Sequence, residues 1–450
     1  MSFPKYPKYK ESGVEWLGEV PEHWRLRPLW TMFRREKRTG FPEEPLLSVY
    51  RDYGVIPKSS RDDNFNKASE DLAAYQLVLP GDLTINKMKA WQGSVAISGH
   101  RGIASPAYHV YQSHHHESRR YLHYLFRSAE YISSYLSRSK GIRVNQWDLE
   151  PQQHSRMAVL MPPREEQCGI AHFLDGETAK IDALIAEQQR LIGLLKEKRQ
   201  AVILQAVTKG SDPCVTMKDS GVECLGEVPE HWQIAALKNY VHVIDCKHVT
   251  ADLTDQGYPL ASIREVQEFE VNLATAKNTS EHYYRILTEG GRKPKVGDII
   301  YSRNATVGEA ALVASHEDFA MGQDVCLLRW KRQEMSSAYL GYQLRSPAVL
   351  SQLEQLMVGA TFRRINVDAI RQYIVVVPPP IEQHAIANHL AVLLSEIDAM
   401  RNDADGLIAL LQERRSALIS AAVTGKIDVR NWRPPNDQQP PEPAREVVHG

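Results

Sequence analysis

Residues 162–210 read PPREEQCGIAHFLDGETAKIDALIAEQQRLIGLLKEKRQAVILQAVTKG and decide the architecture of this 450-residue chain. Two prolines followed by Glu165 and Glu166 suit a helix start, because proline loses no hydrogen bond there and acidic charge complements the helix dipole. Gly210 can supply the left-handed turn that ends the helix. A helix of about 45 residues is about 65 Å long at ~1.5 Å per residue. It must therefore lie against another long helix or hold two bodies apart.

The partner helix is predicted in the same chain, at residues 378–426, which read PPPIEQHAIANHLAVLLSEIDAMRNDADGLIALLQERRSALISAAVTGK. The two stretches match at an offset of 216 residues, at polar as well as apolar positions. Apolar residues recur at spacings of three, four and seven, which is typical of a coiled-coil seam. The predicted seam consists of Ile170, Leu174, Ile181, Leu184, Leu191, Leu195, Val202, Ile386, Leu390, Ile397, Met400, Leu407, Leu411 and Leu418.

A second repeat precedes each half of the chain. The phrase SGVEWLGEVPEHW at residues 12–24 returns as SGVECLGEVPEHW at residues 220–232, with one difference in thirteen. Near-identity over this length indicates an internal duplication. The predicted segments are an N-terminal segment with the first repeat motif (1–24), a first variable body (25–161), a central long helix (162–210), a linker with the second repeat motif (211–232), a second variable body (233–377), a distal long helix (378–426) and a disordered tail (427–450).

The predicted fold class is α/β (α+β). Each body has short β-rich pieces broken by Gly and Pro, a tyrosine-rich helical stretch (118–137 in the first body), and a buried strand that leads into the long helix. We expect two tandem mixed α/β domains, each followed by a long α-helix. The two helices should pair as an antiparallel coiled coil with an internal pseudo-two-fold repeat.

Composition favours a globular cytoplasmic protein, with 24% charged and 43% hydrophobic residues. No apolar run is long enough to cross a bilayer, so we expect no membrane contact. The five cysteines lack metal-binding spacing, and we expect no metal site. A net charge of −1 does not indicate a nucleic-acid binder, yet residues 25–150 hold 19 Lys and Arg against 13 Asp and Glu.

Known catalytic motifs are missing from the sequence. It contains no Gly-rich phosphate loop, no GxSxG, no HExxH and no Asn-Pro-Pro-aromatic motif. We therefore predict no catalytic residues, and the pattern favours binding over catalysis.

Equivalent loops of the two bodies carry Arg, Lys, Asn and Gln, the side chains that read base edges and contact phosphates. The candidate DNA-binding residues of the first body are Asn86, Lys87, Lys89, Trp91, Gln92, Arg101, Lys140, Arg143, Asn145 and Gln146. Those of the second body are Arg303, Asn304, Thr306, Gln323, Arg363, Arg364 and Asn366.

These motifs together resemble a known family. The repeated SGVEWLGEVPEHW, the strands ending in Pro-Pro, the Glu-Gln and Ile-Ala that follow, and the helix end near AAVTGK are similar to the DNA specificity subunit of type I restriction–modification systems. The resemblance runs from Ser12 to about Asp428. It implies that each body reads one half of a split target, that the helix pair acts as a ruler, and that the chain itself is not an enzyme.

The resemblance also implies partners. These are double-stranded DNA, two methyltransferase (modification) subunits, and restriction/translocase subunits. S-adenosylmethionine, ATP and Mg²⁺ are then expected on the partner subunits, and no cofactor on this chain.

Two other functions stay open at the level of sequence. One is a self-sufficient methyltransferase or nuclease with an unrecognised site, which methyl transfer to DNA by the purified chain alone would establish. The other is a non-catalytic coiled-coil adaptor with two protein-binding heads. Failure to bind DNA with the methyltransferase partner present would favour the adaptor.

Overall fold

The computed structural model describes residues 3–51, 53–61, 69, 71–141, 147–304, 306–332, 335–356 and 364–433. The chain divides into two compact units. Unit 1 consists of Met1–Gln188 and Gly406–Gly450, and unit 2 is Gln189–Asp405. Each unit therefore combines one body with one half of each long helix. Across the described residues, no helix has the length and apolar character that crossing a membrane requires.

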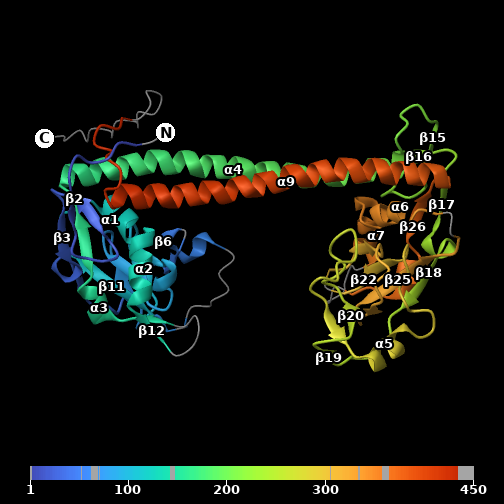
Figure 1. Cartoon of the computed structure of the whole chain (residues 1–450), viewed down its shortest axis with the longest axis horizontal. Helices are drawn as coiled ribbons and strands as arrows, with labels where there is room; N and C mark the ends of the chain where they lie inside the picture. Colours follow the sequence, from blue (N-terminus) through green and yellow to red (C-terminus); the bar gives the residue numbers. More distant parts are fainter. Residues whose placement is uncertain are drawn as a thin grey trace. The chain divides into compact units, whose positions relative to one another are not determined.

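Two long helices frame the units, α4 at Arg164–Lys209 and α9 at Pro380–Val423. In unit 1 the start of α4 lies beside the end of α9, and in unit 2 the end of α4 lies beside the start of α9, so the pairing is antiparallel (Figure 1). Gly210 ends α4 with a φ of 73°, as predicted. The second helix ends three residues earlier than expected, and Gly425 with a φ of 77° makes the corresponding turn.

Unit 1 contains a four-stranded antiparallel sheet in the order β4-β11-β8-β9 and several two-stranded pairs. Its core joins this sheet to α1, α2 and the ends of the long helices. The strands are β1 Tyr9–Glu11, β2 Glu19–Pro21, β3 Arg25–Pro28, β4 Phe33–Arg35, β5 Leu47–Tyr50, β6 Gly54–Pro57, β7 Gln76–Val78, β8 Leu83–Asn86, β9 Val95–Ile97, β10 Gly102–Ala104, β11 Tyr108–Ser113, β12 Ser139–Lys140, β13 Asp148–Leu149 and β14 Ala158–Met161. The short helices are η1 Leu29–Thr31, η2 Lys58–Ser60, η3 Ala90–Gln92, α1 Arg119–Phe126, α2 Ala129–Ser137 and α3 Pro151–Ser155.

Unit 2 repeats this plan with the order β18-β25-β22-β23 and adds a second sheet, β19-β21-β20-β24. The strands are β15 Met217–Asp219, β16 Glu227–Pro229, β17 Gln233–Ala236, β18 Val241–Asp245, β19 Leu253–Thr254, β20 Tyr258–Ala261, β21 Lys277–Thr279, β22 Ile299–Ser302, β23 Ala310–Leu312, β24 Ala320–Met321, β25 Val325–Trp330 and β26 Ile374–Val377. The short helices are η4 Leu237–Asn239, α5 Glu281–Thr288, α6 Ser337–Leu344, α7 Pro347–Leu356 and α8 Val367–Arg371.

The tyrosine-rich stretch differs from its expected single helix. It forms two helices, α1 and α2, which are separated at Arg127 and Ser128. The Ser128 hydroxyl donates to the Leu125 carbonyl at 2.9 Å, and the backbone N–H of Ser128 bonds the same carbonyl at 3.1 Å. These local bonds close one helix tightly and start the next in a new direction.

The tail also differs in part from its prediction. Residues 427–433 are ordered, since the Asp428 N–H donates to the Pro4 carbonyl at 2.7 Å and the Trp432 ring lies 5.3 Å from that of Phe173. The indole buries enough apolar surface to hold this short piece in place. The rest of the predicted disordered tail lies outside the described residues.

The predicted seam is enclosed at its ends and open in the middle of each helix. Buried seam residues are Ile170, Leu174, Ile181, Leu195, Ile386, Leu390, Ile397 and Leu411. Val202 and Leu418 are half-buried. The expectation of burial is wrong for Leu184 and Leu407 in unit 1 and for Leu191 and Met400 in unit 2, which are exposed. A pair of helices covers only one stripe of each, and burial elsewhere requires a body packed against it.

The repeated Pro-Glu-His-Trp motif anchors the start of each long helix. In unit 1, His23 Nε2 lies 2.8 Å from Glu166 Oε2 and Trp24 Nε1 donates to Oε1 at 3.1 Å; these three residues are called the Glu166 corner. In the Glu382 corner of unit 2, His231 Nε2 lies 2.8 Å from Glu382 Oε1, and the Trp232 indole donates to Oε2 at 2.9 Å. The motif therefore joins each body to its helix.

A buried tyrosine adds a second contact to each joint, that is, to the place where a body is bonded to the ends of the long helices. Tyr121 donates to the Leu160 carbonyl at 3.0 Å and lies 3.3 Å from that of Val423, the last residue of α9. In unit 2, Tyr339 does the same with Val376 at 3.1 Å and Val207 near the end of α4 at 3.2 Å. Burial raises the pKa of both phenols well above the usual value, so both remain protonated donors. Each body thus holds the start of one long helix and the end of the other.

Candidate nucleic-acid interface

In unit 1 the structure brings most of the described candidates to one end of the central sheet. Asn86, Lys87, Lys89, Trp91 and Gln92 lie on the connection from β8 through η3 to β9. A backbone bond at 3.1 Å from Leu149 N–H to the Lys87 carbonyl fixes the β12–β13 hairpin beside this connection. Lys140 belongs to that hairpin, and it is therefore grouped with the loop candidates.

Two of the three lysines in this group have acidic neighbours. Lys87 Nζ lies 3.0 Å from Asp148, and Lys140 Nζ lies 3.3 Å from Glu150. Lys89 and Gln92 are exposed. Surface ion pairs of this kind contribute little to stability, so the lysines can exchange their partners for phosphate at small cost.

Two indoles form the apolar part of the same surface. The rings of Trp91 and Trp147 are 5.0 Å apart at an angle of 59°, and the Trp91 N–H donates to the Met88 carbonyl at 3.1 Å. Trp147 was not among the predicted residues, although it follows directly on them in the segment GIRVNQWDL. The remaining predictions there, Arg143, Asn145 and Gln146, lie outside the described residues.

Arg101 lies apart from this group. It follows the end of β9 at Ile97, and this end pairs with Leu83, at the opposite end of β8 from Asn86. Its guanidinium is bonded to Glu44, with Nε 2.8 Å from a carboxylate oxygen. The structure therefore does not bring Arg101 together with the loop candidates.

In unit 2 the predicted cluster forms, but Arg303 does not belong to its surface. The side chain is only 5% exposed and its Nη2 lies 2.8 Å from Asp245 Oδ1. The expected role in base contact is therefore wrong for Arg303. Asp245 lies 58 residues earlier in the chain, at the end of β18, and holds the guanidinium inside the body.

Buried Arg303 instead organises the loop around it. Its N–H donates to the Asp324 carbonyl at 2.8 Å, and its carbonyl accepts from Ile365 N–H at 2.9 Å. Asn304 Nδ2 donates to Asp324 at 3.2 Å, and Asn304 forms an isolated β-bridge with Arg364. Three distant segments therefore meet at the end of β22.

The other predicted residues of unit 2 line this meeting point. Gln323 and Arg364 are exposed, and the Gln323 amide donates to Thr250 at 2.9 Å. Thr306 lies 3.2 Å from the Ser302 hydroxyl. Asn366 caps α8 by accepting from Ala369 N–H at 2.7 Å, which leaves its amide nitrogen for other contacts. Arg363 lies outside the described residues.

One group of potential metal ligands adjoins this loop. Ligand atoms of Asp245, Cys246 and His248 lie within 4.8 Å of one another. Arg303 Nη2 is 3.6 Å from Cys246 Sγ as well as bonded to Asp245, and burial raises the pKa of the Cys246 thiol to about 11. The guanidinium already supplies the positive charge, and the thiol stays protonated. The arrangement fits an ion pair better than a metal centre.

Comparison with known proteins agrees with this geometry. A family model described as the type I restriction modification DNA specificity domain matches residues 230–404. The putative type I restriction enzyme MjaX specificity subunit of Methanocaldococcus jannaschii is 22% identical over 464 residues, covering 96% of this chain and 99% of that protein. The type I restriction enzyme EcoKI specificity subunit of Escherichia coli K12 is 20% identical over 451 residues, covering 93% and 92%.

A solved chain has the same fold. It comes from a structure of the type I R-M system that concerns complex assembly and conformational transition, and it matches with a TM-score of 0.67 and 15% identity. The match covers 90% of this chain and 98% of that chain. The duplicated bodies, each packed on half of α4 and half of α9, are the fold that this likeness supports. The family model and the curated relatives together support a DNA specificity subunit of a type I restriction–modification system.

Proposed function

We propose that this chain is the non-catalytic DNA specificity subunit of a type I restriction–modification complex, and that each unit reads one half of a split target. The observation that carries the proposal is the duplication itself. The His and Trp of the repeated motif bond Glu166 in one unit and Glu382 in the other, whereas the loops at the end of β8 and of β22 differ in sequence. A repeated frame with divergent loops suits two heads that read different bases.

The long helices set the distance between the two half-sites in this proposal. α4 has 46 residues and is about 69 Å long at ~1.5 Å per residue. Two turns of B-DNA span about 70 Å. Inserting seven residues into both helices, after Gln188 and after Asp405, should lengthen the tolerated gap between half-sites. An unchanged gap would contradict the ruler.

Two modification subunits would dock on exposed apolar residues of the helix pair. Unit 1 exposes Leu184, Leu407 and Leu410, and unit 2 exposes Met400, Leu191 and Leu194. These are the same three positions, because each residue of one set lies 216 residues from its counterpart. Exposed apolar patches mark interaction surfaces. Their duplication favours two copies of one partner, which would carry S-adenosylmethionine; ATP and Mg²⁺ would belong to restriction subunits.

Docking can be tested with one substitution in each unit. Leu410 is 64% exposed and Leu194 is 52% exposed, so Leu410→Glu and Leu194→Glu should leave folding intact. Each variant should lower the number of bound modification subunits from two to one, and the double variant should bind none. Native mass spectrometry measures this directly. Leu253→Glu, at an equally exposed leucine on β19, is the matched control.

The function itself is tested by the methylation pattern of a host genome that carries this chain with its modification subunit. Deleting the chain should remove one split motif with a methylated adenine in each half. Replacing Lys89, Trp91 and Gln92 by Ala should relax only one half-site, and replacing Gln323 and Arg364 by Ala only the other. An unchanged pattern after deletion would favour the adaptor with two protein-binding heads.

A further inference from the structure

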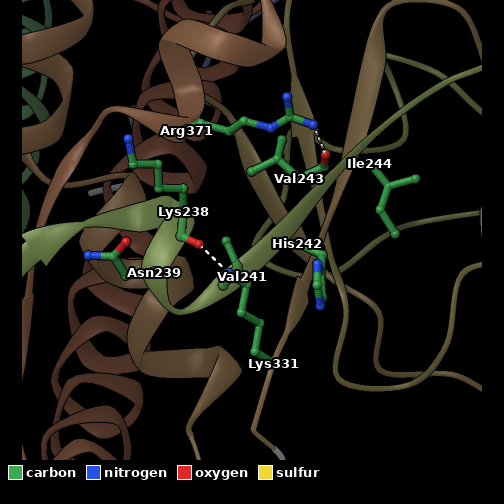
Figure 2. A pocket seen from close by; sticks show the side chains of 8 residues that line it. All are labelled: Lys238, Asn239, Val241, His242, Val243, Ile244, Lys331 and Arg371. Carbon is green, nitrogen blue, oxygen red and sulfur yellow. Dashed lines mark hydrogen bonds between the residues drawn. The ribbon is translucent and has the colours of Figure 1, made fainter.

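A basic groove in unit 2 lies outside every residue considered so far. It encloses about 480 Å³ along the outer edge of β18. Figure 2 shows the side chains around it, which come from η4, from β18, from the residue after β25 and from α8. Its lining residues are Lys238, Asn239, Val241, His242, Val243, Ile244, Lys331 and Arg371. The described lining residues thus include three permanent cations and no carboxylate.

The local bonds leave most of this positive charge available. Lys331 Nζ donates to the Lys238 carbonyl at 2.5 Å, which neutralises no charge, and Lys238 Nζ lies 3.3 Å from the Gln372 side-chain oxygen. Arg371 donates to the Val243 carbonyl at 3.0 Å and to Asp368 at 2.8 Å, so its charge is partly compensated. Lys238 and Lys331 are both exposed, and no carboxylate in the described part of the chain forms an ion pair with either.

The position of the groove connects it to the candidate loops. β18 ends at Asp245, which anchors Arg303 beneath the loop at the end of β22. Helix α8 begins after Asn366, one of the candidates, and ends at Arg371 in the groove. The groove along the edge strand β18 therefore runs toward the end of the sheet at which the candidate loop lies. Residues 233–377 hold equal numbers of acidic and basic residues, 16 of each, so this edge is basic by local arrangement.

The corresponding edge of unit 1 is basic as well. β4 holds the same outer place in the sheet as β18, and the repeat offset of 208 residues pairs Arg34 with His242. Arg34 and Arg35 are both exposed on β4. Both bodies thus carry basic residues at this outer strand, on β4 itself in unit 1 and on the segments beside β18 in unit 2. A feature that is common to both heads cannot distinguish their bases, but it suits the backbone that both half-sites share.

We propose that the groove along β18 binds backbone phosphates of double-stranded DNA and positions the second half-site against the loop of Gln323 and Arg364. This inference rests on the proposed function and adds to it the residues that contact phosphate. Lys238 and Lys331 each neutralise a phosphate, and each releases condensed counterions when DNA binds. The contribution is independent of base sequence.

The test is the salt dependence of DNA binding by the chain assembled with its modification subunits. Lys238→Ala/Lys331→Ala should reduce the slope of log K against log salt by about 1.8, at about 0.9 per phosphate. The salt-induced loss of affinity between about 50 and about 200 mM should therefore shrink roughly 10-fold. Affinity at low salt should fall equally for cognate and shuffled DNA, and their ratio should stay the same.

Two further variants separate this role from a structural one. Lys238→Arg/Lys331→Arg keeps both charges and should restore the slope, although it changes the bond to the Lys238 carbonyl. Arg264→Ala/Lys277→Ala removes two exposed cations of unit 2 from outside the groove and should leave the slope unchanged. The proposal that the groove binds phosphate would be wrong if Lys238→Ala/Lys331→Ala left the slope unaltered. It would also be wrong if the control Arg264→Ala/Lys277→Ala changed the slope equally. If the complex with the wild-type chain does not bind cognate DNA at all, the proposed function itself is wrong.

Discussion

The Glu166 and Glu382 corners have the same motif and the same bonds, but different surroundings. The Glu166 side chain is 6% exposed, and that of Glu382 is 41% exposed. The difference comes from residues outside the motif. Tyr6 donates a further hydrogen bond to Glu166, and the Arg430 guanidinium lies 5.0 Å from the centre of the Tyr6 ring.

The comparison shows that an identical motif can carry different energetic weight. A hydrogen bond is stronger in a low-dielectric interior, and a buried polar group left without its partner is costly. Burial, followed by the bond to Glu166, raises the pKa of Tyr6 far above its usual value, so the phenol remains a donor. Tyr6 and Arg430, which lie outside the repeated motif, therefore stabilise only the unit 1 copy of this contact.

The largest expected effect is the loss of Glu166. Glu166→Ala leaves the N–H of Trp24 and the hydroxyl of Tyr6 buried without an acceptor, and it should destabilise unit 1 by on the order of 2–4 kcal/mol. Glu382→Ala should cost unit 2 only about 1 kcal/mol, because water replaces the carboxylate there. Hydrogen exchange of the amides in α1 and α6 measures the two units separately.

Two companion variants sharpen this test. Glu165→Ala removes an exposed carboxylate from the same turn and should change little. Tyr6→Phe should reduce the difference between the corners by about 1 kcal/mol, since it removes the one bond that only unit 1 has. Equal losses for Glu166→Ala and Glu382→Ala would show that the contacts of Tyr6 and Arg430 contribute nothing to the stability of unit 1.

A second difference between the units is sensitive to pH. Glu130 on α2 accepts hydrogen bonds from the Ser420 hydroxyl and from Lys426 Nζ, the latter at 3.1 Å. In unit 2 the equivalent positions hold Ala348 and Leu204, which pack in an apolar cluster. Burial alone would raise the pKa of Glu130, but the bonds from Ser420 and Lys426 outweigh it and the pKa is lowered.

The sign of the pH dependence follows from this shift. A carboxyl with a lowered folded-state pKa stabilises the fold above the ordinary Glu value of about 4.3, and the contribution disappears as pH falls through the folded-state pKa. Glu130→Gln should therefore cost unit 1 about 0.5–1 kcal/mol at neutral pH, after allowance for solvent screening. The cost should vanish in acid, and exchange in unit 2 should not respond. A cost that persists in acid would assign the effect to shape rather than charge.

The frame was predictable from sequence because its signals are local and duplicated. The helix periodicity, the prolines before each helix and the terminal Gly210 are all read from neighbouring residues. The repeat also shows which positions matter, since Glu166 and Gln167 recur as Glu382 and Gln383. Their partners could not be predicted, because bonds such as that from Trp24 to Glu166 span 142 residues.

The candidate site was less predictable, for the same physical reason. Arg303 follows a strand in a polar loop and looks exposed, but Asp245 holds it inside the body. Leu191 and Leu407 follow the heptad pattern and yet are exposed, because the pattern does not say where a body covers the helices. The groove of Lys238 and Lys331 joins residues 93 positions apart, and only the fold brings them together.

The smallest expected effect concerns a feature that the units share. Arg199 Nη1 lies 2.7 and 2.8 Å from the two oxygens of Asp398, and Arg415 lies 2.9 and 3.4 Å from those of Asp182. The four residues are related by the offset of 216, so each unit has one bridge between its half-helices. All are partly exposed, and double-mutant cycles should give about 0.3–1 kcal/mol for each pair, less at high salt. The tighter contacts predict the larger coupling at Arg199. If the Arg415 pair couples more strongly instead, the extra stability of unit 1 extends along its helices and is not confined to the burial of Glu166.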